Sequence, residues 1–167
     1  KHRPHKPFAL LYPDLETLQE DVVITATETQ ALQSLEAPIL LLPLQVQPAS
    51  GICREAIAPD LDQLGVMLPY APLLELIAQR FGKPLVATSA NLSGSPIVFT
   101  DELALNSLFA YADLILTHNR EISSAQDDSV IRFTPKSEQR IMLRRSRGFA
   151  PNYFEPEWLP QVPILAM

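Results

Sequence analysis

Short apolar blocks alternate with polar ones along this chain, and their spacing predicts strands and helices in alternation. Apolar runs bounded by proline or glycine are typical of buried strands, and apolar residues three to four positions apart are typical of helices. These signals predict strands over residues 8–12, 39–44, 65–68, 84–87, 113–116, 129–133 and 140–143, with an interruption at Pro43. They also predict a short helix after Asp14, helices over 27–35, 72–81 and 101–109, and a long irregular loop over 45–61.

The order of these elements predicts the fold class. Strands alternate with helices through the middle of the chain, and strands follow strands near its end. That order favours an α/β domain with a twisted mixed sheet flanked by helices. From residue 150 onward the prolines at 151, 156, 160 and 163 favour an extended connector. We therefore expect one domain over 1–150 and a linker over 151–167.

Composition excludes several classes of protein. The chain has 167 residues, of which 47% are hydrophobic and 19% charged, a composition typical of a globular domain. Its single cysteine, Cys53, excludes an internal disulfide and a cysteine-cluster zinc site. No apolar run is long enough to span a membrane and no signal peptide is visible, so we expect a cytoplasmic protein with no membrane partner. The sequence contains neither a Walker A loop nor a Gly-x-Gly-x-x-Gly motif.

Positive charge is concentrated in two short segments of an otherwise acidic chain. The net charge is −6. Residues 1–13 hold three cations and no acid, and residues 139–154 hold four cations and no acid, so these segments carry +7 and the remainder −13. If the fold brings the two segments together, they form a pocket suited to a compact polyanion such as a nucleotide. The alternative is two solvated segments.

The first basic segment contains Lys1, Arg3 and Lys6 immediately before a predicted strand. Residues two apart in a strand point to the same side, so Lys1 and Arg3 can grip one anion together. The alternative is a frayed basic terminus.

The polar run over 88–94 directly follows a predicted strand. Ligands of α/β sheets bind at the carboxyl ends of strands, and the Ser89 hydroxyl and Asn91 amide can bind phosphate oxygens or a ribose there. The alternative is a simple turn that caps a helix.

The last candidates surround the final two strands. Ser129, at the start of a strand, is a candidate phosphate contact, and the acids at 127 and 128 either hold a metal ion through water or are ordinary loop acids. We assign no metal ligands. Arg144, Arg145 and Arg147 cannot share one strand face, so at least one should point into any pocket that the sheet lines. The alternative is a solvated edge.

In this order, these segments resemble a known family. Lys1-His-Arg3-Pro4 is similar to the Lys-x-Arg motif of the YrdC-like proteins, the threonylcarbamoyl-adenylate synthases, and Ser89-Ala-Asn91 to their Ser-x-Asn motif. Six segments are more specific and resemble the YrdC-like domain of the hydrogenase maturation carbamoyltransferases (HypF). They cover residues 3–9, 68–73, 86–94, 117–122, 127–130 and 143–148, and the resemblance extends over about 1–150.

The resemblance implies a fragment of a multidomain enzyme that uses ATP, Mg²⁺ and carbamoyl phosphate. This domain would make carbamoyl adenylate from the derived carbamate. The carbamoyl group would pass, with the help of adjoining domains, to the C-terminal cysteine of a partner maturation protein. It would become the cyanide ligand of the nickel–iron hydrogenase centre.

The resemblance also implies residue roles. Lys1 and Arg3 would contact carbamate and the α-phosphate. The triphosphate would be held by Arg145 with Arg144 or Arg147, and Lys6 is a further, less favoured candidate for phosphate binding. Ser89, Asn91 and Ser129 would position phosphate and metal. Members of the family have residues before the Lys-x-Arg motif, so we expect a sheet that lacks its N-terminal strand or strands, with an exposed edge.

Three alternatives remain. A stand-alone threonylcarbamoyl-adenylate synthase for tRNA modification would share the pocket but bind threonine, and the six specific segments count against it. A double-stranded RNA-binding module would use a basic concave face. The acidic remainder and the lack of aromatic residues among the basic ones count against that module. A purely structural domain would use its basic ends to dock onto neighbours.

Overall fold

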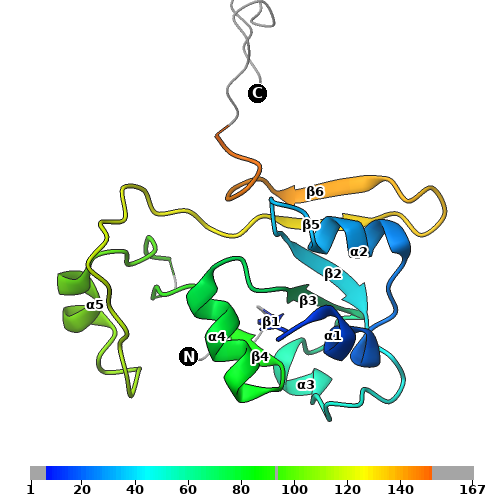
Figure 1. Ribbon diagram of the computed structural model, residues 1–167, viewed down its shortest axis with the longest axis horizontal. Helices are drawn as coiled ribbons and strands as arrows, with labels where there is room; N and C mark the ends of the chain where they lie inside the picture. The colour runs from blue at the N-terminus through cyan, green and yellow to red at the C-terminus, as the bar shows by residue number, and fades with distance from the viewer. Residues whose placement is uncertain (1–6, 93, 152–167) are drawn as a thin grey trace, which may run out of the picture.

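The computed structural model describes residues 7–92 and 94–151, which form a six-stranded mixed sheet with helices on both faces (Figure 1). The strands are β1 (Ala9–Leu11), β2 (Ile39–Pro43), β3 (Gln63–Met67), β4 (Leu85–Ala87), β5 (Val130–Phe133) and β6 (Arg140–Arg144). Their order across the sheet is β4-β1-β3-β2-β5-β6. The β1–β3 and β2–β5 pairs are parallel, and the other three neighbouring pairs are antiparallel. The predicted α/β fold with a mixed sheet is confirmed.

The described helices are α1 (Leu15–Asp21), α2 (Ala26–Leu32), α3 (Arg54–Ile57), α4 (Pro72–Phe81) and α5 (Asp101–Ser107). Local sequence explains where they begin and end. The Asp14 carboxylate accepts a hydrogen bond from the Thr17 amide and caps α1. In α4, Pro72 occupies the first turn and Gly82 ends the helix with a φ of 69°. The observed bounds of α4 are the predicted ones.

Two apolar clusters hold the helices against the sheet. One face of the strands packs with α1 and α2 around a large buried cluster, in which Leu10, Leu40 and Val66 are fully buried or nearly so. The opposite face packs with α4 around a smaller cluster that contains Leu11 and Ala78. The adjacent β1 residues Leu10 and Leu11 therefore pack on opposite faces of the sheet, because successive side chains of a strand alternate between its two faces.

Three predictions about the elements need correction. Residues 113–116 form no strand: Leu114 and Leu116 are 89% and 68% exposed, and no neighbouring strand accepts them. The stretch over 45–61 is not wholly irregular, because it contains the single-turn helix α3. Pro43 does not interrupt β2 but pairs with Gln63 of β3. It lies beyond the part of β2 that pairs with β5, so the missing N–H costs no bond on that side.

The sheet has two edges, β4 and β6, and α5 lies apart from the body of the domain (Figure 1). No residue of α5 is buried. Completion of the sheet by preceding strands stays a prediction. The linker expected over 151–167 lies, apart from Pro151, outside the described residues. None of the helices in the described part of the chain combines the length and the apolar character that a membrane span requires.

Candidate functional site

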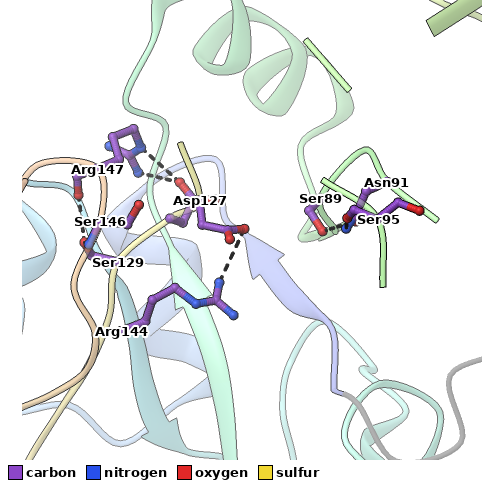
Figure 2. A network of polar contacts seen from close by, with 9 residues as sticks. Ser89, Asn91, Ser95, Asp127, Ser129, Arg144, Ser146 and Arg147 are labelled. Atoms are coloured by element: carbon purple, nitrogen blue, oxygen red, sulfur yellow. Dashed lines mark hydrogen bonds and ion pairs between the residues drawn. The ribbon is translucent and has the colours of Figure 1, made fainter. Parts of the chain in front are cut away.

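The polar run after β4 folds into a turn that is bonded to itself (Figure 2). The Ser89 hydroxyl donates to Oδ1 of Asn91 at 2.7 Å, and Nδ2 of Asn91 donates to the Ser95 carbonyl at 2.7 Å. The Val98 amide closes the loop by donating to the Ala90 carbonyl at 2.8 Å. Ser89 and Asn91 are both half-buried. The two predicted side chains are therefore brought together and their directions are set by each other.

Ser129 is fully buried and joins two segments that are far apart in the sequence. Its hydroxyl donates to the Arg147 carbonyl at 2.9 Å and accepts from the Ser146 amide at 2.8 Å. Its carbonyl accepts from the Ile39 amide at 2.8 Å. The serine thus fastens the turn after β6 to the beginning of β5. Direct contact between this hydroxyl and a phosphate stays a prediction, and the turn would have to open for it.

An irregularity in β6 redirects the chain just before the arginines. Val130 pairs with Arg144, but the next residue, Ile131, pairs with Met142, so Leu143 is an extra residue in β6. A bulge of this kind bends a strand and changes the direction of its side chains. Because β5 and β6 are antiparallel, the end of β6 lies beside the segment before β5, and the bulge falls next to the arginines.

Arg144 and Arg145 are both exposed, and they differ in their partners. Nη1 of Arg144 lies 3.6 Å from Oδ1 of Asp127, and both side chains are about half exposed. Such a pair contributes little to stability and leaves the arginine accessible. Arg145 forms no hydrogen bond or ion pair within residues 7–92 and 94–151. Its guanidinium is the more available of the two.

Arg147 is held on several sides, and Figure 2 shows the dashed lines from its guanidinium to a carboxylate of the segment before β5. Its Nε and Nη2 donate to Oδ1 of Asp128 at 2.9 and 2.8 Å. Nη2 also donates to the Ala37 carbonyl at 2.8 Å, and Nη1 to the Glu36 carbonyl at 3.4 Å. Its guanidinium carbon lies 3.6 Å from the centre of the Tyr70 ring, a cation–π contact. The structure therefore places the third predicted arginine in an intramolecular network.

The two groups of candidates lie at opposite ends of the strands. The turn with Ser89 follows the end of β4, beside the beginning of the antiparallel strand β1. Ser129 precedes β5, which begins beside the beginning of β2 and so at the end of β3 and β1. Three strands separate β4 from β5, a distance of about 19 Å at the usual strand spacing. A ligand that contacts both groups must bridge part of this separation, and the long arginine side chains can bridge the rest.

Lys1, Arg3 and Lys6 lie outside the described residues, so their predicted meeting with the other candidates stays a prediction. The strand that follows them begins at the end of the sheet where the Ser89 turn lies. Among the described residues, no group of three or more histidine, cysteine or acidic side chains is arranged to hold a metal ion. Asp127 and Asp128, the acids considered for that role, each pair with an arginine.

Sequence reasoning missed Tyr70 as a member of the site. Burial raises the pKa of its phenol, and the nearby Asp128 carboxylate raises it further, while Arg147 lowers it. Tyr70 and Ala37 also line an open groove of about 520 Å³ between the end of α2 and the beginning of α4. No pattern in the sequence links Tyr70 to Arg147, because the contact depends on the strand order.

A second missed feature is a buried polar cluster around Asp21. The carboxylate, fully buried, accepts from the Tyr12 hydroxyl at 2.9 Å and the Ser50 amide at 2.9 Å, and also from the Ser50 hydroxyl. Burial and the Asp21 charge both raise the pKa of the Tyr12 phenol. The cluster fixes the loop after β2 to α1. None of the predicted site residues takes part in it.

A family model, curated relatives and solved structures all match this chain over most of its length. A family model described as "Telomere recombination" (Sua5/YciO/YrdC) matches residues 1–146. The carbamoyltransferase HypF of Rhodobacter capsulatus is 44% identical over 151 residues, which are 90% of this chain and 19% of that protein. The solved structure of full-length HypF in the phosphate- and nucleotide-bound form is 40% identical, with a TM-score of 0.80 over 89% of this chain and 23% of that one.

A more distant relative belongs to the other branch considered above. The threonylcarbamoyl-AMP synthase of Vibrio cholerae is 34% identical over 107 residues, which are 61% of this chain and 55% of that protein. The chain spans about a fifth of the length of the HypF proteins that it matches.

Proposed function

This chain belongs to the Sua5/YciO/YrdC family, and we propose that it forms carbamoyl adenylate from ATP and carbamate within a larger carbamoyltransferase. The observation that carries the proposal is the 44% identity with a carbamoyltransferase HypF over 90% of the chain. The chain spans only a fifth of the length of such proteins, so the steps before and after adenylation in the whole protein are proposals as well. In those steps carbamate is derived from carbamoyl phosphate. The carbamoyl group then passes to a maturation partner for cyanide-ligand synthesis.

The proposed reaction is a displacement at phosphorus. A carbamate oxygen attacks the α-phosphorus of ATP and forms a new P–O bond. The bond from that phosphorus to the bridging oxygen breaks, and pyrophosphate leaves with the electron pair. Carbamate is already an anion, so the step needs no strong general base. The obstacle is repulsion between two anions, which is larger in a partly desolvated site than in water.

Cationic side chains can offset this repulsion at both ends of the ligand. We assign Lys1 and Arg3 to carbamate and the α-phosphate, and Lys6 is a further candidate for phosphate binding. Arg145 and Arg144 are assigned to the β- and γ-phosphates, because both are exposed beside the beginning of β5. Arginine suits this role, since its planar donors match phosphate oxygens. Charge that develops on the leaving pyrophosphate is then stabilised in place.

The Ser89 turn would contact the ligand at the other end of the sheet. Its hydroxyl and the Asn91 amide are held by their own hydrogen bond and by the Ser95 carbonyl. The Ser89 hydroxyl has a single donor, which the Asn91 oxygen accepts, so the hydroxyl must turn away from Asn91 to donate to a phosphate oxygen. The separation between this turn and the arginines supports a long ligand such as a nucleoside triphosphate over a single phosphate group.

The described donors do not form a cage for Mg²⁺. The two nearby carboxylates pair with arginines, and Mg²⁺ in nucleotide enzymes is usually held by substrate phosphates and waters with few protein ligands. We therefore propose that Mg²⁺ arrives with ATP, where it would neutralise phosphate charge. The protein's own part is to orient the triphosphate with Arg144 and Arg145.

One alternative retains a specific observation in its favour. The similarity to a threonylcarbamoyl-AMP synthase over 61% of the chain supports the same adenylation chemistry with threonine as the additional substrate. Both proposals predict Mg-ATP binding, so the substrate that reacts must be tested directly.

The test is exchange of labelled pyrophosphate into ATP, because exchange reports reversible adenylate formation. Ammonium bicarbonate supplies carbamate in solution, and bicarbonate with threonine supplies the competing substrate. Exchange with the first mixture supports carbamoyl adenylate, and exchange only with threonine overturns it. Arg145→Gln should lower exchange, while Arg80→Gln, at the exposed end of α4, should not. Calorimetric binding of Mg-ATP, compared with a short RNA duplex, shows whether the chain binds nucleotide or RNA.

A further inference from the structure

Arg147 differs from its two neighbours because its hydrogen-bonding capacity is already used within the protein. A guanidinium has five N–H donors, and the contacts to Asp128, Ala37 and Glu36 use four of them. One face of its plane lies on the Tyr70 ring. A phosphate could bind it in the two-donor mode only if some of these bonds broke.

We propose that Arg147 is a positioning residue, which holds the end of β6 with Arg144 and the following turn with Arg145, and does not itself contact the ligand. The inference rests on the proposed function, since it concerns how those two arginines are presented to the triphosphate. Tyr70 and Asp128 act with Arg147 in this role.

The contacts of Arg147 connect four segments of the chain. They reach the corner between α2 and β2 through the carbonyls of Glu36 and Ala37, and the segment after β3 through Tyr70. They reach the segment before β5 through Asp128. Arg147 itself follows β6. The end of β6 is therefore fastened to three other elements by one side chain.

Backbone bonds extend this attachment to the arginines. The Arg147 amide donates to the Asp127 carbonyl at 3.1 Å, and its carbonyl accepts from the Ser129 hydroxyl at 2.9 Å. Asp127 in turn lies beside the Arg144 guanidinium. Loss of the Arg147 side chain should therefore loosen both the turn and the acid that orients Arg144.

The geometry requires arginine and not merely a positive charge. A lysine ammonium could pair with Asp128, but it lacks the planar fork that reaches two carbonyls while lying on a ring. A residue that bound phosphate directly would keep part of its effect as lysine, because the charge remains although the paired planar donors are lost. This difference separates a positioning role from a ligand role.

The first experiment uses the protein without ligand. Hydrogen exchange of the backbone amides should accelerate in Arg147→Gln and Arg147→Lys around residues 36–39, 127–130 and 146–150. Arg145→Gln should leave these amides unchanged. Unchanged protection in both Arg147 variants would overturn the proposal, whatever the chain binds. Tyr70→Leu, which removes the ring but not the guanidinium, should accelerate exchange in the same segments, and Tyr70→Phe should not.

The second experiment measures Mg-ATP affinity by calorimetry. Arg147→Lys should weaken binding about tenfold, as much as Arg147→Gln, whereas Arg145→Lys, which keeps the charge, should bind more tightly than Arg145→Gln although less tightly than the unsubstituted chain. Full affinity in Arg147→Lys with a large loss in Arg147→Gln would identify Arg147 as a direct charge contact and overturn the proposal.

A thermodynamic cycle of variants distinguishes two causes of lost Mg-ATP affinity, namely misplaced arginines and a general loss of stability. If Arg147 acts through its neighbours, Arg147→Gln should cost little further affinity in a chain that already carries Arg144→Gln and Arg145→Gln. Additive losses overturn the positioning role. If the unsubstituted chain binds no Mg-ATP, the proposed function fails, and so does the claim that Arg147 positions ligand-binding arginines. The hydrogen-exchange experiment then shows independently whether Arg147 fastens the turn after β6.

Discussion

Gly148 packs against the backbone of Glu36 so closely that a Cβ atom on the glycine would lie 2.3 Å from the Glu36 carbonyl oxygen. The φ angle of Gly148 is 86°, in the left-handed region. The contact lies one residue beyond Arg147, and both residues fasten the turn after β6 to the corner before β2.

Gly148→Ala should therefore destabilise the domain by about 3 kcal/mol, from the unfavourable φ and the steric clash together. Urea unfolding measures the loss. Gly82→Ala is the matched control, because Gly82 has a φ of 69° but no atom within 4 Å of the added Cβ. It should lose only about 1 kcal/mol. Equal losses in the two variants would show that the contact with Glu36 is not tight.

The Tyr12 phenol should make stability depend on alkaline pH. Its pKa is raised in the folded protein by burial and by the Asp21 carboxylate, while in the unfolded chain it is near 10. The neutral phenol therefore stabilises the fold fully below about pH 10, and this contribution falls as the pH rises above that value. Tyr12→Phe should lower the free energy of unfolding at pH 7 by about 1–2 kcal/mol and flatten its decline above pH 10. An unchanged decline in that variant would contradict the assignment.

The Asn91 amide should govern the shape of the turn after β4. Asn91→Asp keeps an acceptor for the Ser89 hydroxyl but loses the donor to the Ser95 carbonyl, and Asn91→Ala loses both bonds. We expect the protection of the Val98 amide from hydrogen exchange to fall in both variants. The amide should exchange faster in the alanine variant than in the aspartate variant. Mg-ATP affinity should fall most in Asn91→Ala. Aspartate adds a negative charge, so measurements at two salt concentrations separate repulsion from the lost bond.

The outer face of α4 should tolerate charge. Leu76 is 69% exposed, whereas Ala78 on the same helix is fully buried against the sheet. Leu76→Lys should change the free energy of unfolding by less than about 0.5 kcal/mol and reduce binding of an apolar dye. Ala78→Lys should unfold the domain, because a charge would be buried without a partner. A large loss of stability in Leu76→Lys would mean that this face is covered in solution.

The sequence predicted correctly those helices whose ends are set by residues within the helix or next to it. The ends of α4 follow from Pro72 and Gly82, and the beginning of α1 follows from Asp14, because these residues act through nearby backbone groups. The expected strand over 113–116 failed for the opposite reason. A run of apolar residues forms a strand only where another strand supplies hydrogen bonds, and no strand of the described chain lies beside it.

The site was predictable only in its parts. The sequence indicated the Ser89–Asn91 turn, because its contacts span few residues. It indicated three arginines, at the end of β6 and just after it, but not which of them turns inward. That choice depends on the extra residue in β6 and on carbonyls more than a hundred positions away. Sequence spacing contains no information about such distant partners.

The attachment of the β6 turn also bears on the order of folding. Arg147 and the Glu36 carbonyl are 111 residues apart in the sequence, whereas β5 and β6 are joined by a short connection. The β5–β6 hairpin can form locally, but its docking on β2 must close a long loop and repay the entropy of that closure. We expect the candidate site to mature only when this docking is complete. An unfinished chain would then present no assembled arginine turn to a nucleotide.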